Sequence, residues 1–389
     1  MKRMKFDRRK VLMAGATVLL AGCQIIPGGS ASRTPAPPPP PTTTTPVPSP
    51  TPSALPQDEE RHRVALLVPM SGANGDVGES IANATTMALL DANADNLRIT
   101  TYDTATGAAS AAARAIADGN ALILGPLLAE NVSAVRAVAR PADVPLIAFS
   151  NDASVAGPDA YVIGHIPEQS IERTVRYAGE QGSRNFAAIV PDGEYGRRAE
   201  AALTDSIRTF GGRLVGVERY TRGNSSITSA AQRLRARGGY DTVLIADGTR
   251  LAAQAAAEFR QGGTQILGTE LWSGEADVFR SPSLRGAWFS AVSDARFRRF
   301  SETYEDRFGS KPYRIATLGY DAVLLALNVA QDWRVGRDFP AGALQSEDGF
   351  LGLDGPFRFQ RNGVVYRAME VREVQADEVT IVDAAPARF

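Results

Sequence analysis

The sequence has few of the residues that build disulfides and metal sites. Its 389 residues include one cysteine and two histidines. A single cysteine cannot form an internal disulfide, and two histidines are too few for a histidine-rich metal site. We therefore expect no metal ligands, and we interpret His62 and His165 as polar connecting residues.

The sequence also has almost no net charge and lacks the common catalytic motifs. The formal net charge is -1, which gives no electrostatic basis for binding nucleic acid. The chain contains no G-x-S-x-G, H-E-x-x-H or G-x-x-x-x-G-K motif, so we expect no enzyme and no catalytic residue. Gly72, Gly75 and Gly78 are spaced by three, whereas a dinucleotide fingerprint needs its first two glycines two apart. This spacing disfavours NAD, and we expect no cofactor.

The N-terminus is typical of an export signal over residues 1–22. Met1–Lys10 is basic, Val11–Leu20 is apolar, and small residues follow, which is too short to span a bilayer. Leu20-Ala21-Gly22-Cys23 resembles the lipobox of bacterial lipoproteins. The resemblance implies a lipid anchor at Cys23 in the periplasmic face of the outer membrane; an ordinary signal, the inner membrane and twin-arginine export stay open.

Residues 23–62 are expected to form a tether. Pro27–Gln57 consists mainly of proline, threonine, serine and alanine, a composition that cannot bury enough apolar surface to fold. In polyproline II form, at about 3.1 Å per residue, it would reach on the order of 80 to 100 Å.

An alternation of apolar strands and helices starts at Arg63 and predicts parallel sheets. The first half has expected strands at 64–68, 97–102, 121–124 and 145–149, and a crossing segment at 161–165. The second has strands at 185–190, 213–220, 242–246 and 265–267, with helices starting near 168, 194, 225 and 249. Further on we expect a strand at 285–290, helices at 294–308 and 312–332, and strands near 357, 364–374 and 379–382.

The loop after the first strand carries a family resemblance. The sequence VPMSGANGDVGESIANA, residues 68–84, resembles the opening of type I periplasmic-binding proteins, the leucine/isoleucine/valine-binding family. The family implies a two-lobed α/β fold, each lobe a doubly wound, mostly parallel sheet, with three crossover strands near 163, 288 and 350. Lobe 1 would contain residues 63–165 and 286–349, and lobe 2 residues 166–285 and 350–389.

A narrower resemblance is to the penicillin-binding protein activator lipoproteins. It is carried by residues 64–84, 122–135 with 145–152, 187–200, and 319–326 with 350–363. It implies a non-catalytic regulator of peptidoglycan synthesis whose partner is a penicillin-binding protein. The alternative is the substrate-binding lipoprotein of an ABC transporter for amino acids.

The resemblance also implies a cleft between the lobes that could hold a small molecule. Its candidate residues are Ser71, Gly72, Gly125, Pro126, Ser150, Asn151, Tyr195 and Asp247. Tyr195 matches a cleft tyrosine of the family, and Asp247 falls where receptors often place an acid for the ligand ammonium. The loop Gly125–Glu130 has no hydroxyl and carries an acid, which disfavours a ligand carboxylate.

Overall fold

The structure is a computed structural model that describes residues 60–259, 262–275 and 277–389. The predicted signal at 1–22, the lipid site Cys23 and nearly all of the predicted tether lie outside the described residues. No helix within the described ranges is long and apolar enough to cross a membrane.

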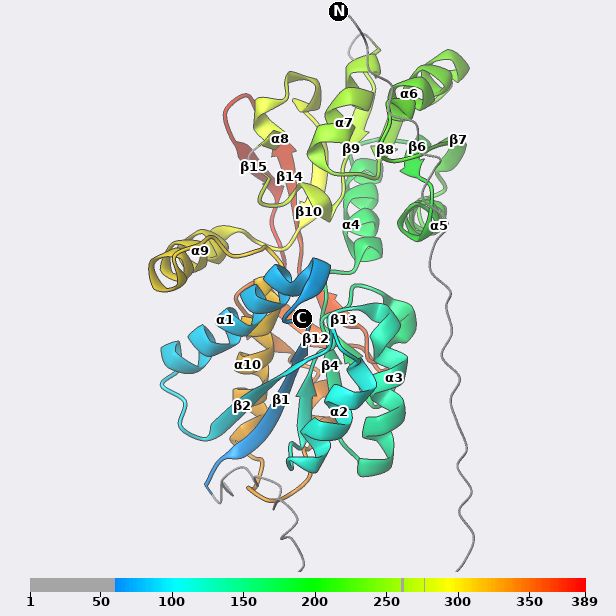
Figure 1. Ribbon diagram of the computed structural model, residues 1–389. Coiled ribbons are helices and arrows are strands. Elements are labelled where there is room, and N and C mark those ends of the chain that lie inside the picture. Colours follow the sequence, from blue (N-terminus) through cyan, green and yellow to red (C-terminus); the bar gives the residue numbers. More distant parts are fainter. Residues whose placement is uncertain (1–59, 260–261, 276) are drawn as a thin grey trace, which may run out of the picture. The chain divides into compact units, whose positions relative to one another are not determined.

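Lobe 1 is built on a five-stranded sheet in which every pairing is parallel (Figure 1). Its strands in spatial order are β2 (Leu97–Asp103), β1 (His62–Val68), β3 (Leu122–Leu124), β4 (Leu146–Ala148) and β5 (Ala160–Val162). Its helices are α1 (Gly75–Asp91), α2 (Ala108–Ala117), α3 (Ala129–Ala139), α9 (Ala295–Phe308) and α10 (Ala316–Ala330). The short apolar strands fit a parallel sheet covered on both faces.

Lobe 2 is built on a seven-stranded mixed sheet. Its order is β15 (Val379–Asp383), β14 (Glu370–Val374), β10 (Trp288–Ala291), β9 (Gln265–Leu267), β8 (Thr242–Ile245), β6 (Asn185–Pro191) and β7 (Arg213–Tyr220). Only the pairings of β10 with β14 and of β14 with β15 are antiparallel. Its helices are α4 (Pro167–Glu180), α5 (Glu194–Arg208), α6 (Ser226–Arg237), α7 (Thr249–Ala256) and the short α8 (Asp277–Arg280).

Alternate residues of β6, an interior strand of this sheet, enter different cores. Phe186 and Ala188 pack with residues of α4 and α5, whereas Ala187 and Ile189 pack with residues of α6 and α7. Successive side chains of a strand point to opposite faces, so the sheet is covered by helices on both sides. The predicted α/β fold with two mostly parallel sheets is therefore confirmed.

A small antiparallel sheet joins the core of lobe 1. It contains β11 (Phe350–Gly352), β12 (Gly355–Phe359) and β13 (Val365–Arg367). Phe357 and Phe359 are buried in the same cluster as the strands of lobe 1, and Val364 forms a bridge with Val162.

Two of the predicted lobe boundaries need correction. We assigned 286–349 to lobe 1, but β10 pairs with β9 and β14 in the sheet of lobe 2. We assigned 350–389 to lobe 2, but β11, β12 and β13 pack on lobe 1, so only β14 and β15 return to lobe 2. The chain therefore passes between the lobes after β5, after β10 and between β13 and β14.

Close backbone contact explains one glycine of the first loop. A Cβ atom on Gly78 would lie 1.7 Å from the carbonyl oxygen of Pro69. The first turn of α1 can therefore approach the end of β1 only because residue 78 has no side chain. Gly196 stands in the same relation to Pro191 at the start of α5, with a distance of 1.8 Å.

Candidate functional site

The predicted cleft residues lie in the loops, or in the first helical turns, that follow parallel strands at the carboxyl edges of the two sheets. Ser71 and Gly72 follow β1, Gly125 and Pro126 follow β3, and Ser150 and Asn151 follow β4; Tyr195 and Asp247 follow β6 and β8. Open α/β sheets bind ligands at this edge.

The loop after β1 is held by an acid from the next strand. The Ser71 hydroxyl donates to Oδ2 of Asp103 at 3.2 Å, and the backbone N–H of Met70 donates to Oδ1 at 2.9 Å. Gly72 has a φ of 73° and no heavy atom within 4 Å of its Cβ position. Both residues are exposed, and the hydroxyl already has a carboxylate partner.

The buried pair Gly125 and Pro126 has a structural role in the sheet. The N–H of Gly125 donates to Ile147 at 2.7 Å, and the carbonyl of Pro126 accepts from Phe149 at 3.0 Å. A Cβ on Gly125 would lie 2.2 Å from the carbonyl oxygen of Leu67. These backbone groups are thus engaged within lobe 1.

Asn151 takes part in a contact between the lobes. Its backbone carbonyl accepts a hydrogen bond from Nη2 of Arg198, on α5 of lobe 2, at 2.7 Å. Arg198 also forms a two-pronged ion pair with Glu168 at 2.5 and 2.7 Å. The neighbouring Ser150 is buried, and its hydroxyl accepts from the N–H of Asp152 at 3.0 Å.

Asp247 is satisfied by groups of its own lobe. Its Oδ2 atom accepts from Nε of Arg222 at 2.7 Å and from the hydroxyl of Tyr220, and its Oδ1 atom accepts from the N–H of Gly248 at 2.8 Å. Burial and the adjacent Asp247 raise the pKa of Tyr220. The position expected to hold a ligand ammonium is therefore occupied by a guanidinium group.

Tyr195 contacts Glu270, an acid that was not among the predicted cleft residues. Its hydroxyl lies 3.0 Å from Oγ1 of Thr269 and donates to Oε1 of Glu270 at 3.3 Å. The other oxygen of Glu270, Oε2, is buried and has no hydrogen-bond partner among the described residues. Burial raises the pKa of Glu270 to about 7, because a carboxylate is poorly solvated there.

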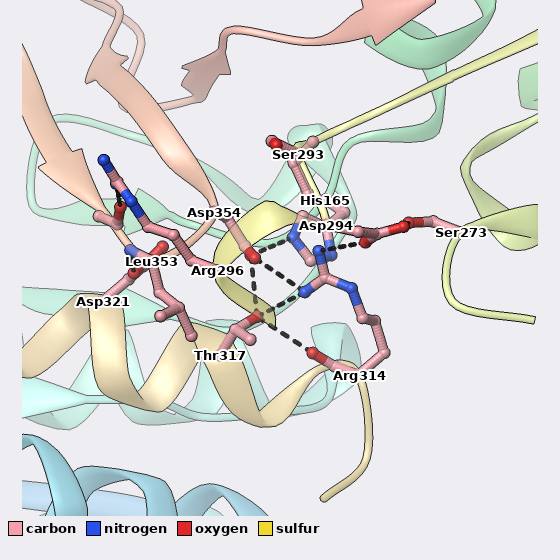
Figure 2. A network of polar contacts seen from close by, with 12 residues as sticks. His165, Ser273, Ser293, Asp294, Arg296, Arg314, Thr317, Asp321, Leu353 and Asp354 are labelled. Atoms are coloured by element: carbon pink, nitrogen blue, oxygen red, sulfur yellow. Dashed lines mark hydrogen bonds and ion pairs between the residues drawn. The ribbon is translucent and has the colours of Figure 1, made fainter. Parts of the chain in front are cut away.

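A network of charged residues lies where the chain crosses between the lobes (Figure 2). Asp354, which is fully buried, accepts from Nη1 of Arg314 at 2.8 Å and from Thr317 at 2.8 Å, and its Oδ2 atom lies 2.7 Å from Nε2 of His165. Burial opposes ionisation of Asp354, but Arg314 and His165 hold its pKa below the usual range. Burial also lowers the pKa of His165, although Asp354 acts in the opposite direction.

The network continues to the second and third crossings. Arg314 reaches Asp294, just after β10, at 3.5 Å, and Asp294 in turn pairs with Arg372 of β14. Arg372 donates from Nε to Glu370 at 2.7 Å and from Nη2 to the carbonyl of Val292 at 2.6 Å. Residues from all three crossings are therefore joined by charge-assisted hydrogen bonds, which are the stronger kind.

A small cavity of about 30 Å³ lies within this region. It is lined by His165, Glu270, Ser273, Ala291, Val292, Arg314 and Met369. Its volume is enough for about one water-sized group. Two of its lining residues, Glu270 and Arg314, carry buried polar atoms without a partner in the described part of the chain, namely Oε2 and Nε.

Sequence reasoning missed the acid and the base of this cavity for different reasons. Glu270 follows β9 as Asp247 follows β8. Because ligands bind where parallel strands end, its position after β9 was a signal that could have identified it. Arg314 lies before α10, and its partner Asp354 lies 40 residues further on; no local pattern joins them. Within the described residues, no group of His, Cys, Asp and Glu could hold a metal ion.

Comparison with known proteins identifies the family. The sequence profile of the periplasmic binding proteins matches residues 62–378. The chain belongs to the periplasmic binding protein family. The two-lobed α/β fold agrees with this membership.

Solved structures share the fold of this periplasmic binding protein at low sequence identity. The leucine-binding protein LivK of Thermotoga maritima has a TM-score of 0.61 and 19% identity, with 83% of this chain and 98% of that chain covered. An ABC transporter substrate-binding protein of Sphaerobacter thermophilus has a TM-score of 0.67, 21% identity, and coverages of 85% and 98%. A solute-binding protein of Rhodopseudomonas palustris BisB5, in complex with 3,4-dihydroxybenzoic acid, has a TM-score of 0.63, 18% identity, and coverages of 85% and 98%.

A curated relative matches only in part. The uncharacterized protein RP748 of Rickettsia prowazekii (strain Madrid E) is 24% identical over 180 residues, which are 46% of this chain. The match spans 48% of that relative.

Proposed function

We propose that this periplasmic binding protein is the solute-binding component of an ABC-type transporter and takes a small hydroxylated solute between its lobes. The observation that carries the proposal is that two residues lining the 30 Å³ cavity each carry a buried polar atom without a partner in the described part of the chain, Oε2 of Glu270 and Nε of Arg314. They come from lobe 2 and lobe 1, respectively, so a ligand that contacts both would join the lobes.

The chemistry of the two atoms restricts the ligand group. An ionised Glu270 oxygen only accepts hydrogen bonds, and the Nε–H of Arg314 only donates. When Glu270 is ionised, an ammonium group would satisfy Glu270 alone and a carboxylate would satisfy Arg314 alone. The pKa of about 7 means that Glu270 is also present protonated near neutral pH, and in that form it could donate to a carboxylate. A hydroxyl group donates and accepts, so it satisfies both within the volume of the cavity.

Three further observations support a hydroxylated solute over a free amino acid. The acid at the expected ammonium position, Asp247, is already paired with Arg222. The backbone groups of Gly125 and Pro126 are engaged within their sheet. Among solved structures of the same fold, one solute-binding protein holds 3,4-dihydroxybenzoic acid.

The test is calorimetric titration with matched solutes that differ by one hydroxyl, for example 4-hydroxybenzoate with benzoate and ribose with deoxyribose. We expect at least one hydroxylated member to bind tenfold or more tightly than its partner, because the missing hydroxyl leaves two buried groups unpaired, at about 1–3 kcal/mol. Free amino acids should bind no tighter than about 0.1 mM, roughly -5.5 kcal/mol. Equal affinity within every pair, or micromolar binding of an amino acid, would contradict the proposal.

A second candidate function is the regulation of peptidoglycan synthesis through contact with a penicillin-binding protein. The filled ammonium position at Asp247 favours it, because a regulator needs no amino-acid ligand. One combination of results would select the regulator. No solute would bind, and adding the purified chain would raise the polymerisation rate of a penicillin-binding protein.

We propose further that a lipid on Cys23 holds the protein at the periplasmic face of the outer membrane; the inner membrane is the alternative, because a transport receptor serves a permease there. The support is the Leu20-Ala21-Gly22-Cys23 sequence with the only thiol of the chain. We expect Cys23→Ala to release the protein from the membrane fraction, since one residue carries the whole anchor. Mass spectrometry of the wild-type N-terminus should find diacylglyceryl-modified Cys23; an unmodified N-terminus at another residue would exclude the anchor.

A further inference from the structure

The outer edge of the lobe 2 sheet is not paired with another strand among the described residues. β15 is the last strand of this sheet and pairs with β14 on one side only. Ile381 and Val382 in this strand are 56% and 36% exposed. An exposed apolar edge strand offers backbone N–H and C=O groups to another chain, and proteins normally protect such edges.

A cavity of about 610 Å³ lies beside this strand. Alternate residues of β15, Val379 and Ile381, line it together with Phe279, Phe289 and Phe297. These phenylalanine side chains come from α8, β10 and α9, so the groove lies between α9 and the β14–β15 hairpin. Its floor contains the satisfied pair of Glu370 and Arg372.

The rim of the groove is acidic. Glu275, Asp377 and Glu378 line it, are exposed, and form no ion pair with any described residue. Arg298 is the one lining base without an acidic partner in the described residues, because Arg372 is paired with Asp294 and Glu370. Three unpaired acids against one unpaired base favour an occupant with positive charge.

We propose that β15 and this groove form a docking site for an extended segment of a partner protein that carries bulky apolar residues alternating with lysine or arginine. The segment adds to the outer edge of β15 as an eighth strand. Its backbone pairs with β15, its apolar side chains enter the groove beside Ile381, and its basic side chains meet Asp377 and Glu378.

Two other occupants fit the surface less well. A second copy of the chain would bring the same surface, with its excess of acids over bases, and would supply no cationic segment to it. The proline-rich segment Thr34–Gln57 contains no lysine or arginine. Its prolines cannot donate to a sheet ladder, so it cannot serve as the added strand.

The test uses the purified full-length chain and labelled eight-residue peptides with alternating valine and lysine. Fluorescence anisotropy should detect binding of the lysine peptide and at least tenfold weaker binding of the matched glutamate peptide. N-methylation of alternate amides keeps the charge but removes the ladder donors, and it should abolish binding. Ile381→Asp should weaken binding at least tenfold, whereas the matched variant Leu90→Asp, at a residue 60% exposed on α1, should bind like the wild type.

Each contrary result overturns the proposal. Equal binding to Ile381→Asp and Leu90→Asp would mean that the peptide does not use β15, and equal binding of the N-methylated peptide would exclude strand addition. Absence of binding by every peptide would exclude the assigned partner chemistry. Sedimentation showing a dimer that Ile381→Asp dissociates would assign the edge to a second copy instead.

Discussion

Replacing Arg314 with methionine is expected to lower the free energy of unfolding by about 3 kcal/mol, because it leaves the carboxylate of Asp354 buried without its cation. The side chain of Arg314 is 19% exposed and that of Asp354 is 0% exposed, so solvent cannot replace the lost charge. Methionine keeps most of the apolar volume of the arginine stem. Urea unfolding at pH 7 measures the change.

Two matched variants separate this effect from a general loss of arginine. Arg280→Met removes an ion pair with Asp277 whose side chains are 68% and 67% exposed, and it should cost less than about 1 kcal/mol. The double variant Arg314→Met with Asp354→Asn removes both charges, so it should be more stable than Arg314→Met alone. A double variant less stable than the single one would show that Asp354 does not depend on Arg314.

Replacing Glu270 with glutamine is expected to raise the free energy of unfolding by about 3 kcal/mol at pH 8. Burial raises the pKa of this carboxyl from 4.5 to about 7, and each tenfold weakening of an acid corresponds to about 1.4 kcal/mol. In the folded protein the group holds its proton up to a higher pH than in the unfolded chain. The stability that it contributes is therefore present below pH 4.5 and is lost as the pH rises through 7.

The pH dependence is the diagnostic part of the Glu270 experiment. The difference between Glu270→Gln and the wild type should be near zero at pH 4.5, grow between pH 4.5 and 7, and stay constant above. Glu194→Gln is the control, since the Glu194 side chain is 63% exposed and its loss should change stability by less than about 0.5 kcal/mol at any pH. A difference for Glu270→Gln that does not vary with pH would contradict the raised pKa.

Glu270 places a cost in stability at the point where the lobes meet. This partly buried acid, with one buried oxygen that has no partner, lines the same cavity as Arg314, whose Nε atom also has no partner in the described part of the chain. Perturbed groups of this kind are concentrated at functional sites. Stability gained by Glu270→Gln together with lost solute binding would show that the acid is kept for binding.

Much of the sheet structure could be predicted from the sequence because parallel strands covered on both faces appear as short apolar runs. The expected strand at 213–220 and the expected strand at 265–267 coincide with β7 and β9. The lobe boundaries could not be predicted in the same way. Whether Trp288–Ala291 joins one sheet or the other depends on its pairing with Leu267 and with Arg372, and such long-range pairing leaves no local signal.

In the candidate site, too, the positions of residues could be predicted from the sequence but their long-range pairing could not. Position at a strand end predicts that Tyr195 and Asp247 lie at the edge of lobe 2, because topology alone fixes this edge. The position of a residue at a strand end does not predict that Arg222 pairs with the carboxylate of Asp247. Nor does it predict that one oxygen of Glu270 has no hydrogen-bond partner among the described residues. Pairing of buried charges is decided by side chains far apart in the sequence, such as Arg314 and Asp354.

The most direct test of the central claim is a crystal structure of the chain with the tightest-binding hydroxylated solute from the matched titrations. The account predicts one hydroxyl oxygen within about 3.2 Å of both Oε2 of Glu270 and Nε of Arg314, with the solute in contact with both lobes. A solute bound elsewhere, or bound between the lobes with no group near these two atoms, would contradict it.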